Sequence, residues 1–490
     1  MAGTAIDFTR DQLYRVLKKI RTNVYEIPQT FRNYMRVPVR IYMTERLLKE
    51  TEDGAIQQAI NVASLPGIVK WSIMLPDAHW GYGFPIGGVA AFDVESGIIS
   101  PGGIGYDINC GVRFLITNLR LEDVRPRLRE LLRSIARNIP AGVGRSGHLR
   151  LSVSQLDEVL AGGAHWAIEN GYGDRRDLNH IEDGGRLEGA DPSKVSPKAK
   201  KRGAPQLGTL GSGNHYIEVE VIDQIFDERA AKRMGIEEVG QIGVMIHTGS
   251  RGLGHQVASD YLEVLRRAAR KYNIRPRDMQ LIYAPFDSPE GQDYFAAMKA
   301  AANYAFANRQ MITHFARRAF YEVFGEDVEL RVVYDVAHNI GKVERHVVDG
   351  VTRKLIVHRK GATRGFAAGR EEIPADYRDI GQPILVGGNM LQGSYILLGT
   401  ETAMEEVFGS TVHGAGRVLS RAAATRRFMG SQIQRWLAEK GILVDSVSRK
   451  VLAEEAPQAY KDLDEVVNAA VGAGIARKAV KMRPLAVWKG

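Results

Sequence analysis

Chemically informative motifs lie very far apart in this chain. Residues of short glycine-bordered motifs, most of which carry a histidine, a cysteine or a carboxylate, are spread from residue 77 to residue 489. No internal repeat, low-complexity tract or Pro/Ser-rich linker divides the chain between them. If these motifs form one site, almost the whole chain must fold around it. We therefore expect residues 1–490 to form a single large α+β domain.

Hydrophobic periodicity predicts helices and short strands that alternate irregularly. Apolar residues at three- and four-residue steps predict helices over 121–137, 259–272 and 292–324, with a last helix pair near 418–439 and 460–480. β-rich runs at 240–246 and 328–334 each end just before a histidine motif. The polar, Gly/Pro-punctuated and basic segment 184–206 is typical of an exposed loop. The absence of a βα repeat argues against a barrel or a Rossmann sheet.

One thiol, one carboxylate and three imidazoles form a candidate metal-ligand set. Asp107 and Cys110 are three residues apart in a glycine-rich turn, which can place both side chains on one ion. A thiolate can bridge two divalent ions, and His215, His247 and His338 could complete two open shells. Two ions about 3.5–4 Å apart would clamp the oxygens of a phosphoryl transfer. Zinc or iron would suit these ligands as readily as manganese. The alternative is a small buried cysteine among structural histidines.

His413 stands in a different setting, because Gly414-Ala415-Gly416 follows it at once. A histidine on a turn rich in backbone N–H groups could attack a phosphorus atom, or it could be a further metal ligand. A second small-residue loop, at 387–390 with Gly393-Ser394, could cradle a nucleotide. The chain contains no GxxxxGK[ST] segment, which argues against an ordinary P-loop NTPase.

Charge and composition favour a polyanionic partner. The formal net charge is +9 and the isoelectric point is near 9.4. Basic clusters at 198–202 and at Arg359, Lys360 and Arg364 lie near the histidine motifs, although each could equally be solvated surface. The chain has no apolar run of the ~18–20 residues that a membrane helix needs, and its N-terminus lacks a signal-peptide pattern. A single cysteine excludes an intramolecular disulfide. We expect a cytoplasmic protein with no membrane partner.

Taken together, the motifs resemble those of the tRNA-splicing ligase RtcB family, the GTP-dependent RNA 3′-phosphate/5′-hydroxyl ligases. The resemblance covers nearly the whole chain, with the segments in the same order. They are Pro76–Gly88, Asp107–Arg113, Gln206–Glu218, His247–Gly254, Asp335–Asn339, His413–Arg417 and Arg483–Gly490. Two segments depart from the family pattern. Residues 387–391 read Gly-Gly-Asn-Met-Leu instead of Pro-Gly-Ser-Met-Gly, and residues 79–81 read His-Trp-Gly instead of His-Gln-Gly.

The resemblance implies a distinctive single α+β fold and a role for each matching residue. Cys110 would bridge two manganese ions, His413 would become guanylylated, and Asp77 would be an acidic residue required near the site. The implied metal ligands are Asp107, Cys110, His215, His247 and His338. The implied guanine-nucleotide contacts are Asn214, His215, Glu218, His338, Asn339, Gly387, Gly388, Asn389, Met390, Ser394, His413, Gly414, Ala415, Gly416 and Lys489.

The implied reaction joins RNA ends, either cleaved tRNA halves or broken RNA. His413 takes GMP from GTP and passes it to an RNA 3′-phosphate, which a metal-activated water forms from a 2′,3′-cyclic phosphate. The 5′-hydroxyl of the other RNA then displaces GMP. Candidate RNA contacts are Arg113, Arg251, Arg417 and residues 198–202, and archease, a small acidic activator, is an implied partner. The rival hypotheses are a dinuclear metal phosphoesterase that forms no covalent nucleotide and an RNA-binding protein with a structural metal.

Overall fold

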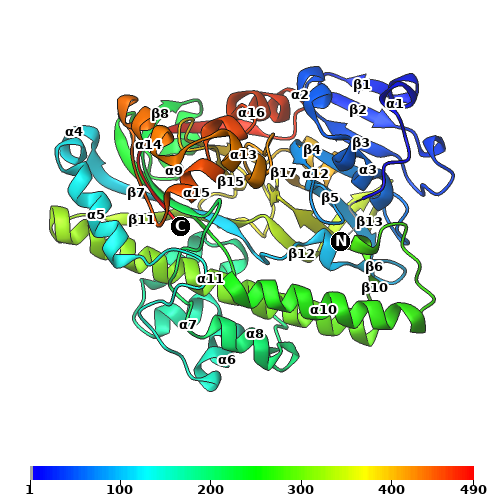
Figure 1. The fold of residues 1–490 in the computed structure, drawn as a ribbon, viewed down its shortest axis with the longest axis horizontal. Helices are drawn as coiled ribbons and strands as arrows, with labels where there is room; N and C mark the ends of the chain where they lie inside the picture. The colour runs from blue at the N-terminus through cyan, green and yellow to red at the C-terminus, as the bar shows by residue number, and fades with distance from the viewer. Residues whose placement is uncertain (1–3) are drawn as a thin grey trace.

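A computed structural model describes residues 4–490 of the chain (Figure 1). Most of its strands belong to two large sheets. The seven-stranded sheet runs in the order β1 (Lys18–Arg21), β2 (Val24–Ile27), β3 (Val39–Tyr42), β4 (Ser72–His79), β5 (Ile86–Asp93), β13 (Val351–Lys360) and β12 (Asn339–Val348). The β3–β4 pair is parallel, and the other pairs in this sheet are antiparallel.

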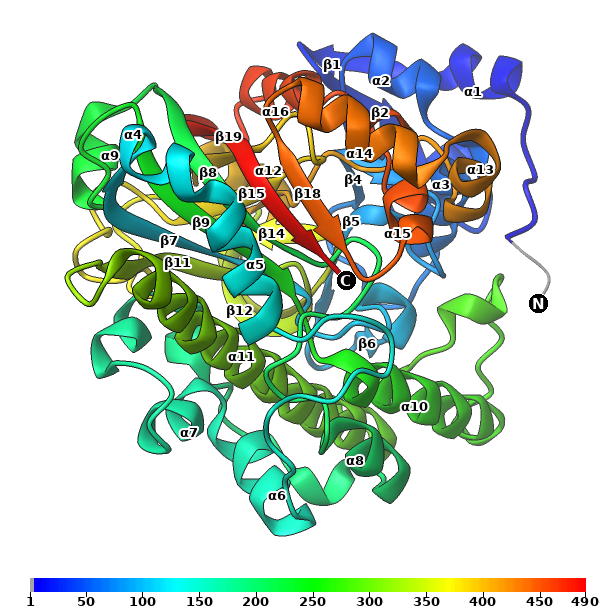
Figure 2. The same ribbon diagram turned by 60° about the vertical axis from the view of Figure 1, so that its left-hand side comes forward.

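The eight-stranded sheet gathers strands from nearly the whole length of the chain. Its order is β11 (Leu330–Ala337), β7 (Gly111–Arg120), β9 (Gln241–Thr248), β8 (Tyr216–Ile225), β19 (Arg477–Lys489), β16 (Ser394–Leu398) and β15 (Pro383–Gly387), and β18 (Leu443–Ser446) pairs with β19 in parallel. Figure 2 shows the C-terminal strand β19 between β8 and β18. Two short pairs complete the strands: β6 (Ile98–Ile99) with β10 (Ala284–Pro285), and β14 (Ala362–Arg364) with β17 (Ser410–Val412).

Helices surround the two sheets. They are α1 (Arg10–Val16), α2 (Glu45–Glu50), α3 (Asp53–Val62), α4 (Leu121–Val124), α5 (Leu128–Asn138), α6 (Val153–Gly162), α7 (Ala164–Glu169), α8 (Pro197–Gly203), α9 (Glu228–Arg233), α10 (Arg251–Lys271), α11 (Pro289–Phe324), α12 (Glu401–Val407), α13 (Arg421–Arg427), α14 (Gly430–Glu439), α15 (Arg449–Glu454) and α16 (Leu463–Gly472). The long helices α10 and α11 lie between the sheets and the small helices α6, α7 and α8 (Figures 1 and 2). This mixed arrangement of mainly antiparallel sheets and separate helices confirms the predicted α+β class.

The longest helix, α11, shows how the sequence sets the element bounds. Ser288 caps its N-terminus by accepting a hydrogen bond from the backbone of Gly291, and Pro289 occupies the first turn, where its missing N–H costs nothing. Gly325 ends the helix at a φ of 91°, a conformation that favours glycine. The predicted helix over 292–324 is therefore confirmed, with one more turn at its start. Strands β9 and β11 likewise confirm the predicted strands at 240–246 and 328–334.

Other predicted elements differ from the structure. The single helix predicted over 121–137 is divided by a 3-10 turn, Arg125–Arg127, because Pro126 cannot continue the α-helical hydrogen bonding. The helix predicted over 259–272 begins earlier, at Arg251. The helix predicted over 418–439 is two helices, α13 and α14.

Two further predictions are wrong over part of their range. In the segment predicted as a helix over 460–480, α16 ends at Gly472 and β19 begins at Arg477. The segment 184–206, predicted to be an exposed loop, contains helix α8. Ser196 caps this helix and Pro197 starts it, and its Ala199 is buried. The basic side chains of this segment are therefore held on a helix.

Candidate active site

Four neighbouring strands bring the predicted metal ligands to one edge of the eight-stranded sheet. Cys110 immediately precedes β7, His215 precedes β8, His247 lies near the end of β9, and His338 follows β11. Val112 on β7 faces His247 in the ladder. The backbone N–H of His338 donates to the carbonyl of Cys110 at 2.9 Å. Strand register therefore collects residues that are more than two hundred positions apart.

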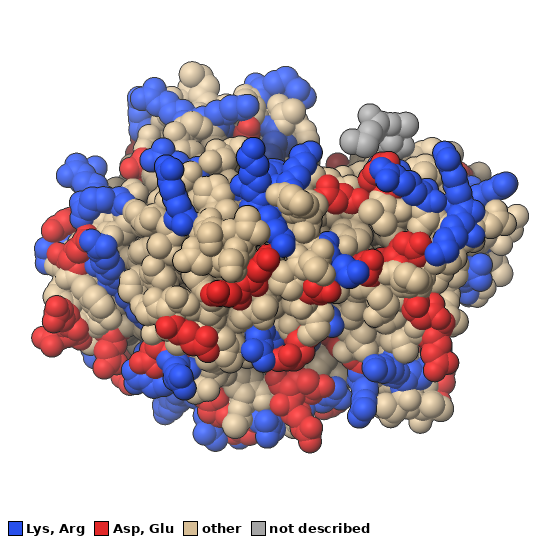
Figure 3. Space-filling model, turned by 90° about the horizontal axis from the view of Figure 1, so that it is seen from below, with Lys and Arg blue, Asp and Glu red and all other residues tan. Residues whose placement is uncertain are grey.

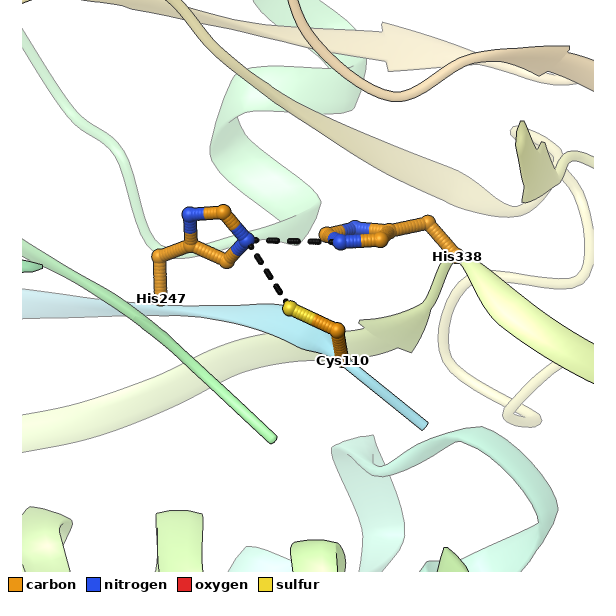
Figure 4. Close-up of side chains that lie close together, drawn as sticks. All are labelled: Cys110, His247 and His338. Carbon is orange, nitrogen blue, oxygen red and sulfur yellow. Dashed lines mark hydrogen bonds between the residues drawn. The ribbon is translucent and has the colours of Figure 1, made fainter. Parts of the chain in front are cut away.

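The five predicted ligands form two groups that share Cys110. Cys110 Sγ lies 3.2 Å from His247 Nε2, which lies 3.3 Å from His338 Nε2 (Figure 4). On its other side, Cys110 Sγ lies 3.4 Å from His215 Nε2, which lies 2.8 Å from Asp107 Oδ2. One sulfur between two three-ligand groups can serve two cations.

Burial controls the protonation of these groups. It raises the pKa of Cys110 well above the usual thiol value, and the Asp107 carboxylate raises it further. Burial, followed by the charge of His215, lowers the pKa of His247, and burial followed by the charge of His413 lowers that of His338. Burial alone would raise the pKa of Asp107, but His215 and other neighbours hold it below its usual range.

These side chains fit a transition-metal ion. The Nε2 atoms of two imidazoles face each other and the same sulfur, an arrangement that is repulsive if both nitrogens are unprotonated and no cation lies between them. A cation would also allow the buried thiol to ionise. Sulfur and imidazole nitrogen are ligands for zinc or iron rather than for calcium or magnesium.

A second layer of contacts holds the ligands in place. His247 Nδ1 lies 2.9 Å from the carbonyl oxygen of Asn214, which orients the ring so that Nε2 faces the ligand group. The buried Arg309 donates to the carbonyl oxygen of Asn109 at 2.8 Å and makes two hydrogen bonds with Asp335. Asn109 itself has a φ of 52°. Arg309 thus fixes the sharp turn that precedes Cys110.

His413 lies beside the metal-ligand groups and is oriented by Asp77. Asp77 Oδ2 accepts hydrogen bonds from His413 Nδ1 at 2.6 Å and from the His413 backbone N–H at 3.0 Å. The His413 ring is centred 4.8 Å from that of His338. When Nδ1–H is donated to the carboxylate, the lone pair stays on Nε2. His413 is therefore a candidate nucleophile, and a buried acid fixes its orientation.

The surroundings of Asp77 are tightly fitted. Gly416 has a φ of 78°, and a Cβ at this position would lie 2.3 Å from the Asp77 carbonyl oxygen, so only glycine allows this approach. Lys461 Nζ donates to the carbonyl of Ala78 at 2.6 Å. Burial lowers the pKa of Lys461 to about 8, although the nearby Asp77 favours its charged form. The acid that orients His413 is therefore itself fixed from both sides.

The predicted nucleotide loop lies against the turn that follows His413. Gly387 and Gly414 form an isolated β-bridge. Asn389 Oδ1 accepts hydrogen bonds from the backbone N–H groups of Leu391 and Gln392, at 2.9 and 3.0 Å, which closes a tight turn. The backbone of this loop is therefore ordered by its own side chain, in a position next to the candidate nucleophile.

Buried charges lie beside this loop. Burial, followed by the neighbouring Glu220, raises the pKa of Glu218 well above its usual value, and burial raises that of Glu220 to about 7. Ser394 Oγ donates to Glu220 Oε1 at 2.6 Å. Burial lowers the pKa of Lys489, whose Nζ lies 5.2 Å from the centre of the Tyr216 ring. Two adjacent buried carboxyls ionise less easily than separate ones, because a charge on one raises the pKa of the other.

A cavity of ≈ 1450 Å³ connects all of these groups. Most of the predicted site residues line it: Asp107, Cys110, Asn214, His215, Glu218, His247, His338, Asn339, Gly387, Gly388, Asn389, Met390, His413, Gly414, Ala415, Gly416 and Lys489. Asp77 and Ser394 are buried behind its wall. The structure therefore brings the predicted residues together, while the role of each remains a prediction.

Further lining residues carried no predicted role. Arg421, Glu455 and Tyr460 line the cavity, and Arg421 Nε lies 3.3 Å from Glu455 Oε1. They come from the ordinary-looking C-terminal helical region. The only indication in the sequence was Lys489. This last predicted contact must lie near the other site residues, and the C-terminal segment that carries it must therefore lie near them too.

Several basic residues predicted to contact RNA are in the interior. Arg113 is fully buried and pairs with Asp335 at 2.8 Å, so its prediction as an RNA contact is wrong. Arg359 is also buried, paired with Glu344. Lys201 and Arg202 are exposed and line the cavity, as predicted for a polyanion contact. Within residues 4–490, no helix combines the length and the apolar character needed to cross a membrane.

Comparison with known proteins gives consistent matches. Residues 58–490 match the family model for tRNA-splicing ligase RtcB. The chain is 57% identical to the tRNA-splicing ligase RtcB of Thermococcus kodakarensis over 478 residues, which are 97% of this chain and 99% of that protein. It is 55% identical to the protein of the same name from Archaeoglobus fulgidus, with the same two coverages. The protein of that name from Pyrobaculum aerophilum is 56% identical over 479 residues, again 97% of this chain and 99% of that protein.

Proposed function

The chain belongs to the tRNA-splicing ligase RtcB family, and we propose that it joins RNA 3′-phosphate or 2′,3′-cyclic phosphate ends to 5′-hydroxyl ends through a His413–GMP intermediate. One observation carries this proposal. His413 is held through Nδ1 by a buried carboxylate, 2.6 Å away, and stands at the edge of a thiol–imidazole cluster inside one large cavity. A phosphoesterase that activates only water could use such a histidine as a general acid, but it would form no covalent nucleotide on His413.

The proposed metal site would hold two Mn²⁺ ions, with Cys110 as a donor to both. His247 and His338 would hold one ion, and Asp107 and His215 the other, following the two groups of donor atoms. The ions would neutralise charge on the phosphates as it develops during the reaction. We propose manganese because the resemblance to the family implies it. The donor set alone would suit other transition metals, such as zinc or iron, as well.

In the first step, His413 Nε2 attacks the α-phosphorus of GTP. An N–P bond forms, the bond from the α-phosphorus to the bridging oxygen breaks, and pyrophosphate leaves. The proton on Nδ1 remains in its hydrogen bond with Asp77, which stabilises the positive charge that the ring acquires. The backbone N–H groups of Gly414 to Gly416, with the loop 387–390 and Lys489, would bind the nucleotide, together with Asn214, Glu218, Asn339 and Ser394.

In the next steps, GMP moves to the RNA and is then released. Water first opens any 2′,3′-cyclic phosphate to a 3′-phosphate. An oxygen of this phosphate attacks the phosphorus of the His413 adduct, the N–P bond breaks, and its electron pair returns to Nε2. The 5′-hydroxyl of the second RNA then attacks the 3′-phosphorus, loses its proton and displaces GMP, which leaves a 3′,5′-phosphodiester. The GMP leaving group makes this last displacement possible near neutral pH.

The proposal extends to the context of the reaction. Residues 1–490 would act as one ligase domain in the cytoplasm, on cleaved tRNA halves or on broken RNA. Archease would assist repeated turnover. Support for the single domain comes from the cavity, whose lining runs from Glu52 to Lys489 in the sequence.

The proposal can be tested by covalent labelling. The protein is incubated with Mn²⁺ and α-labelled GTP, denatured, and compared with a His413→Ala variant. Acid-labile label on the parent protein and none on His413→Ala is the expected result. A His180→Ala variant is a useful control, because His180 is bonded to Asp376 outside the cavity and should not affect labelling. Absence of label with every divalent metal would overturn the ligase mechanism and favour a metal phosphoesterase.

A further inference from the structure

Trp80 is a large aromatic residue that the reaction described above does not use. It directly follows strand β4, next to His79, and lines the catalytic cavity. Its side chain remains 40% exposed. Most of the other large apolar side chains exposed to this extent, such as Phe226, lie away from the cavity. A partly exposed indole in the wall of this cavity offers a surface for a ligand with an aromatic face.

The indole is positioned by a contact that depends on a glycine. A Cβ added to Gly54, in the first turn of α3, would lie 2.5 Å from two atoms of the Trp80 ring. The ring therefore packs directly against the backbone of Gly54. The backbone N–H of Trp80 donates to Glu52 Oε2 at 2.8 Å, and that of Gly81 donates to Gln58 Oε1 at 3.0 Å. Helix α3 thus supports the indole from one side and leaves the remaining surface accessible.

Further aromatic rings lie along the same wall of the cavity. Tyr82 and Tyr106 form an edge-to-face pair with ring centres 5.4 Å apart, and Tyr106 stacks on His255 at 6.0 Å. All three line the cavity, as does Lys360, whose Nζ donates to the carbonyl of Tyr82. Tyr82 lies between β4 and β5, Lys360 ends β13, and His255 lies on α10, whereas Tyr106 lies in the segment before β7. Aromatic rings interleaved with basic groups are typical of sites for single-stranded nucleic acid.

We propose that Trp80 is a stacking platform for an unpaired nucleobase of the RNA end that enters the cavity. The inference rests on the proposed ligase function and adds a base-binding subsite to it. Stacking suits this role because every base has a π face, so that the site accepts any sequence at the end to be joined. The subsite would hold the terminal nucleoside while its phosphate or hydroxyl group reaches toward His413 and the metal ligands.

The test measures RNA affinity without turnover. Short single-stranded RNAs with either a 5′-hydroxyl or a 3′-phosphate end are bound to the Mn²⁺-loaded protein in the absence of GTP. Each RNA is used intact and with an abasic nucleotide at its reacting end. Trp80→Ala should weaken binding of one intact RNA by roughly 5- to 100-fold, the range that loss of one stacked base produces. The same variant should show little further loss with the corresponding abasic RNA. The RNA that responds identifies which end occupies the subsite.

Two further variants separate stacking from a structural effect. Trp80→Phe should retain most of the affinity, and Gly54→Ala, which displaces the ring without removing it, should lower the affinity for intact RNA only. Phe226→Ala is the matched control, because Phe226 is 39% exposed but lies outside the cavity. This variant should change the affinity for neither the intact nor the abasic RNA. Because stacking carries no net charge, the effect of Trp80→Ala should be the same at low and high salt.

Each outcome has a defined meaning. Equal RNA affinities for the parent and Trp80→Ala, or an equal abasic penalty in both proteins, would overturn the subsite. These results would leave the ligase intact if His413 still accepts GMP from labelled GTP, since that step involves no RNA. Failure of the parent protein to form the His413 adduct would instead overturn the proposed function.

Discussion

A single buried carboxylate determines which nitrogen of His413 can react. Asp77 Oδ2 accepts from Nδ1 and also from the backbone N–H of His413, so both the tautomer and the position of the ring depend on it. Asp77 is fully buried, and its other oxygen, Oδ1, has no hydrogen-bond partner. The charge of Asp77 therefore acts mainly on the imidazole, which in the proposed mechanism would become cationic when GMP is attached.

Replacing this charge should slow the formation of the His413 adduct. Asp77→Asn keeps the size of the side chain but removes the charge and can present an N–H to Nδ1, which would favour the wrong tautomer. We expect the rate of guanylylation to fall by roughly 10²- to 10⁴-fold, as for comparable acid–histidine pairs. The rate is measured with labelled GTP under single-turnover conditions. Asp93→Asn, on the neighbouring strand β5, should leave it unchanged, and equal rates for the two variants would contradict the orienting role.

A buried histidine far from the reaction should control stability in acid. His358 on β13 is fully buried, packs against Phe84 and Phe92, and accepts a hydrogen bond from the backbone N–H of Ser100 at 3.1 Å. Burial lowers its pKa from 6.5 to about 4. Between these values the unfolded state binds more protons than the folded state, so stability rises with pH across this window and is lost as the pH falls through it.

The variant His358→Gln should reduce this acid sensitivity. The glutamine can still accept from Ser100, but it cannot become protonated on unfolding. On going from pH 7 to pH 4.5, the parent should lose roughly 2–3 kcal/mol more of its free energy of unfolding than the variant. Urea unfolding at the two pH values measures the difference. Parallel losses in both proteins would show that His358 does not contribute.

Local sequence patterns predicted the elements well where burial and periodicity agree. Helix α11 and strand β9 carry strong repeating patterns and were found as predicted. The helix predicted over 460–480 failed at its end, where β19 begins at Arg477 and where Ala479 and Val480 could equally belong to a helix face. Only pairing with β8, β16 and β18 makes this segment a strand, and such long-range pairing leaves no local signature.

The site was more predictable than the architecture, but not for every residue. Asp107, Cys110 and the three histidines can be recognised in the sequence by their residue types and by their glycine neighbours. Arg113 was misassigned because a buried and an exposed arginine are identical in sequence, and only the position of Asp335 on the neighbouring strand β11 accounts for its burial. Tyr460 and Glu455 were missed for the converse reason, since nothing in their local segment indicates a cavity wall.

Arg309 on helix α11 contacts the turn that carries the candidate metal ligand Cys110. Arg309→Met should cost about 3–5 kcal/mol, because it leaves Asp335 in the interior with one cationic partner and removes a donor from Asn109. The free energy of unfolding is measured in urea. Arg318→Met, an exposed change on the same helix that breaks only a surface pair with Glu322, should cost no more than about 0.5 kcal/mol. Similar costs for both would contradict the supporting role of Arg309.

One face of the molecule carries no uniform patch of positive charge. On the face shown in Figure 3, which is seen from the side of α6 to α8 and α10, basic and acidic side chains are mixed. Several arginines that raise the net charge are neutralised in the interior, among them Arg113, Arg309 and Arg359. Net charge alone is therefore a poor guide to the path of RNA, and basic residues at the cavity are better candidates.

Lys201 and Arg202 are such candidates, because both are exposed on α8 and line the cavity, whereas the adjacent Lys200 pairs with Asp157 at 2.7 Å. If they contact RNA phosphates, the double substitution Lys201→Gln and Arg202→Gln should weaken binding at low salt and reduce the slope of log affinity against log salt by about 1 to 1.5. The slope is measured by titrating single-stranded RNA at several salt concentrations.

The control for this measurement is a second adjacent basic pair on a short helix. Lys232 and Arg233 on α9 are exposed but lie outside the cavity, so changing both to glutamine removes the same formal charge at a distance. If only net charge mattered, the two double variants would lower the salt slope equally. If RNA follows the rim of the cavity, only the change at Lys201 and Arg202 lowers the slope, since counterions are released from phosphates that are directly neutralised. An equal effect of both pairs would therefore contradict a path past α8.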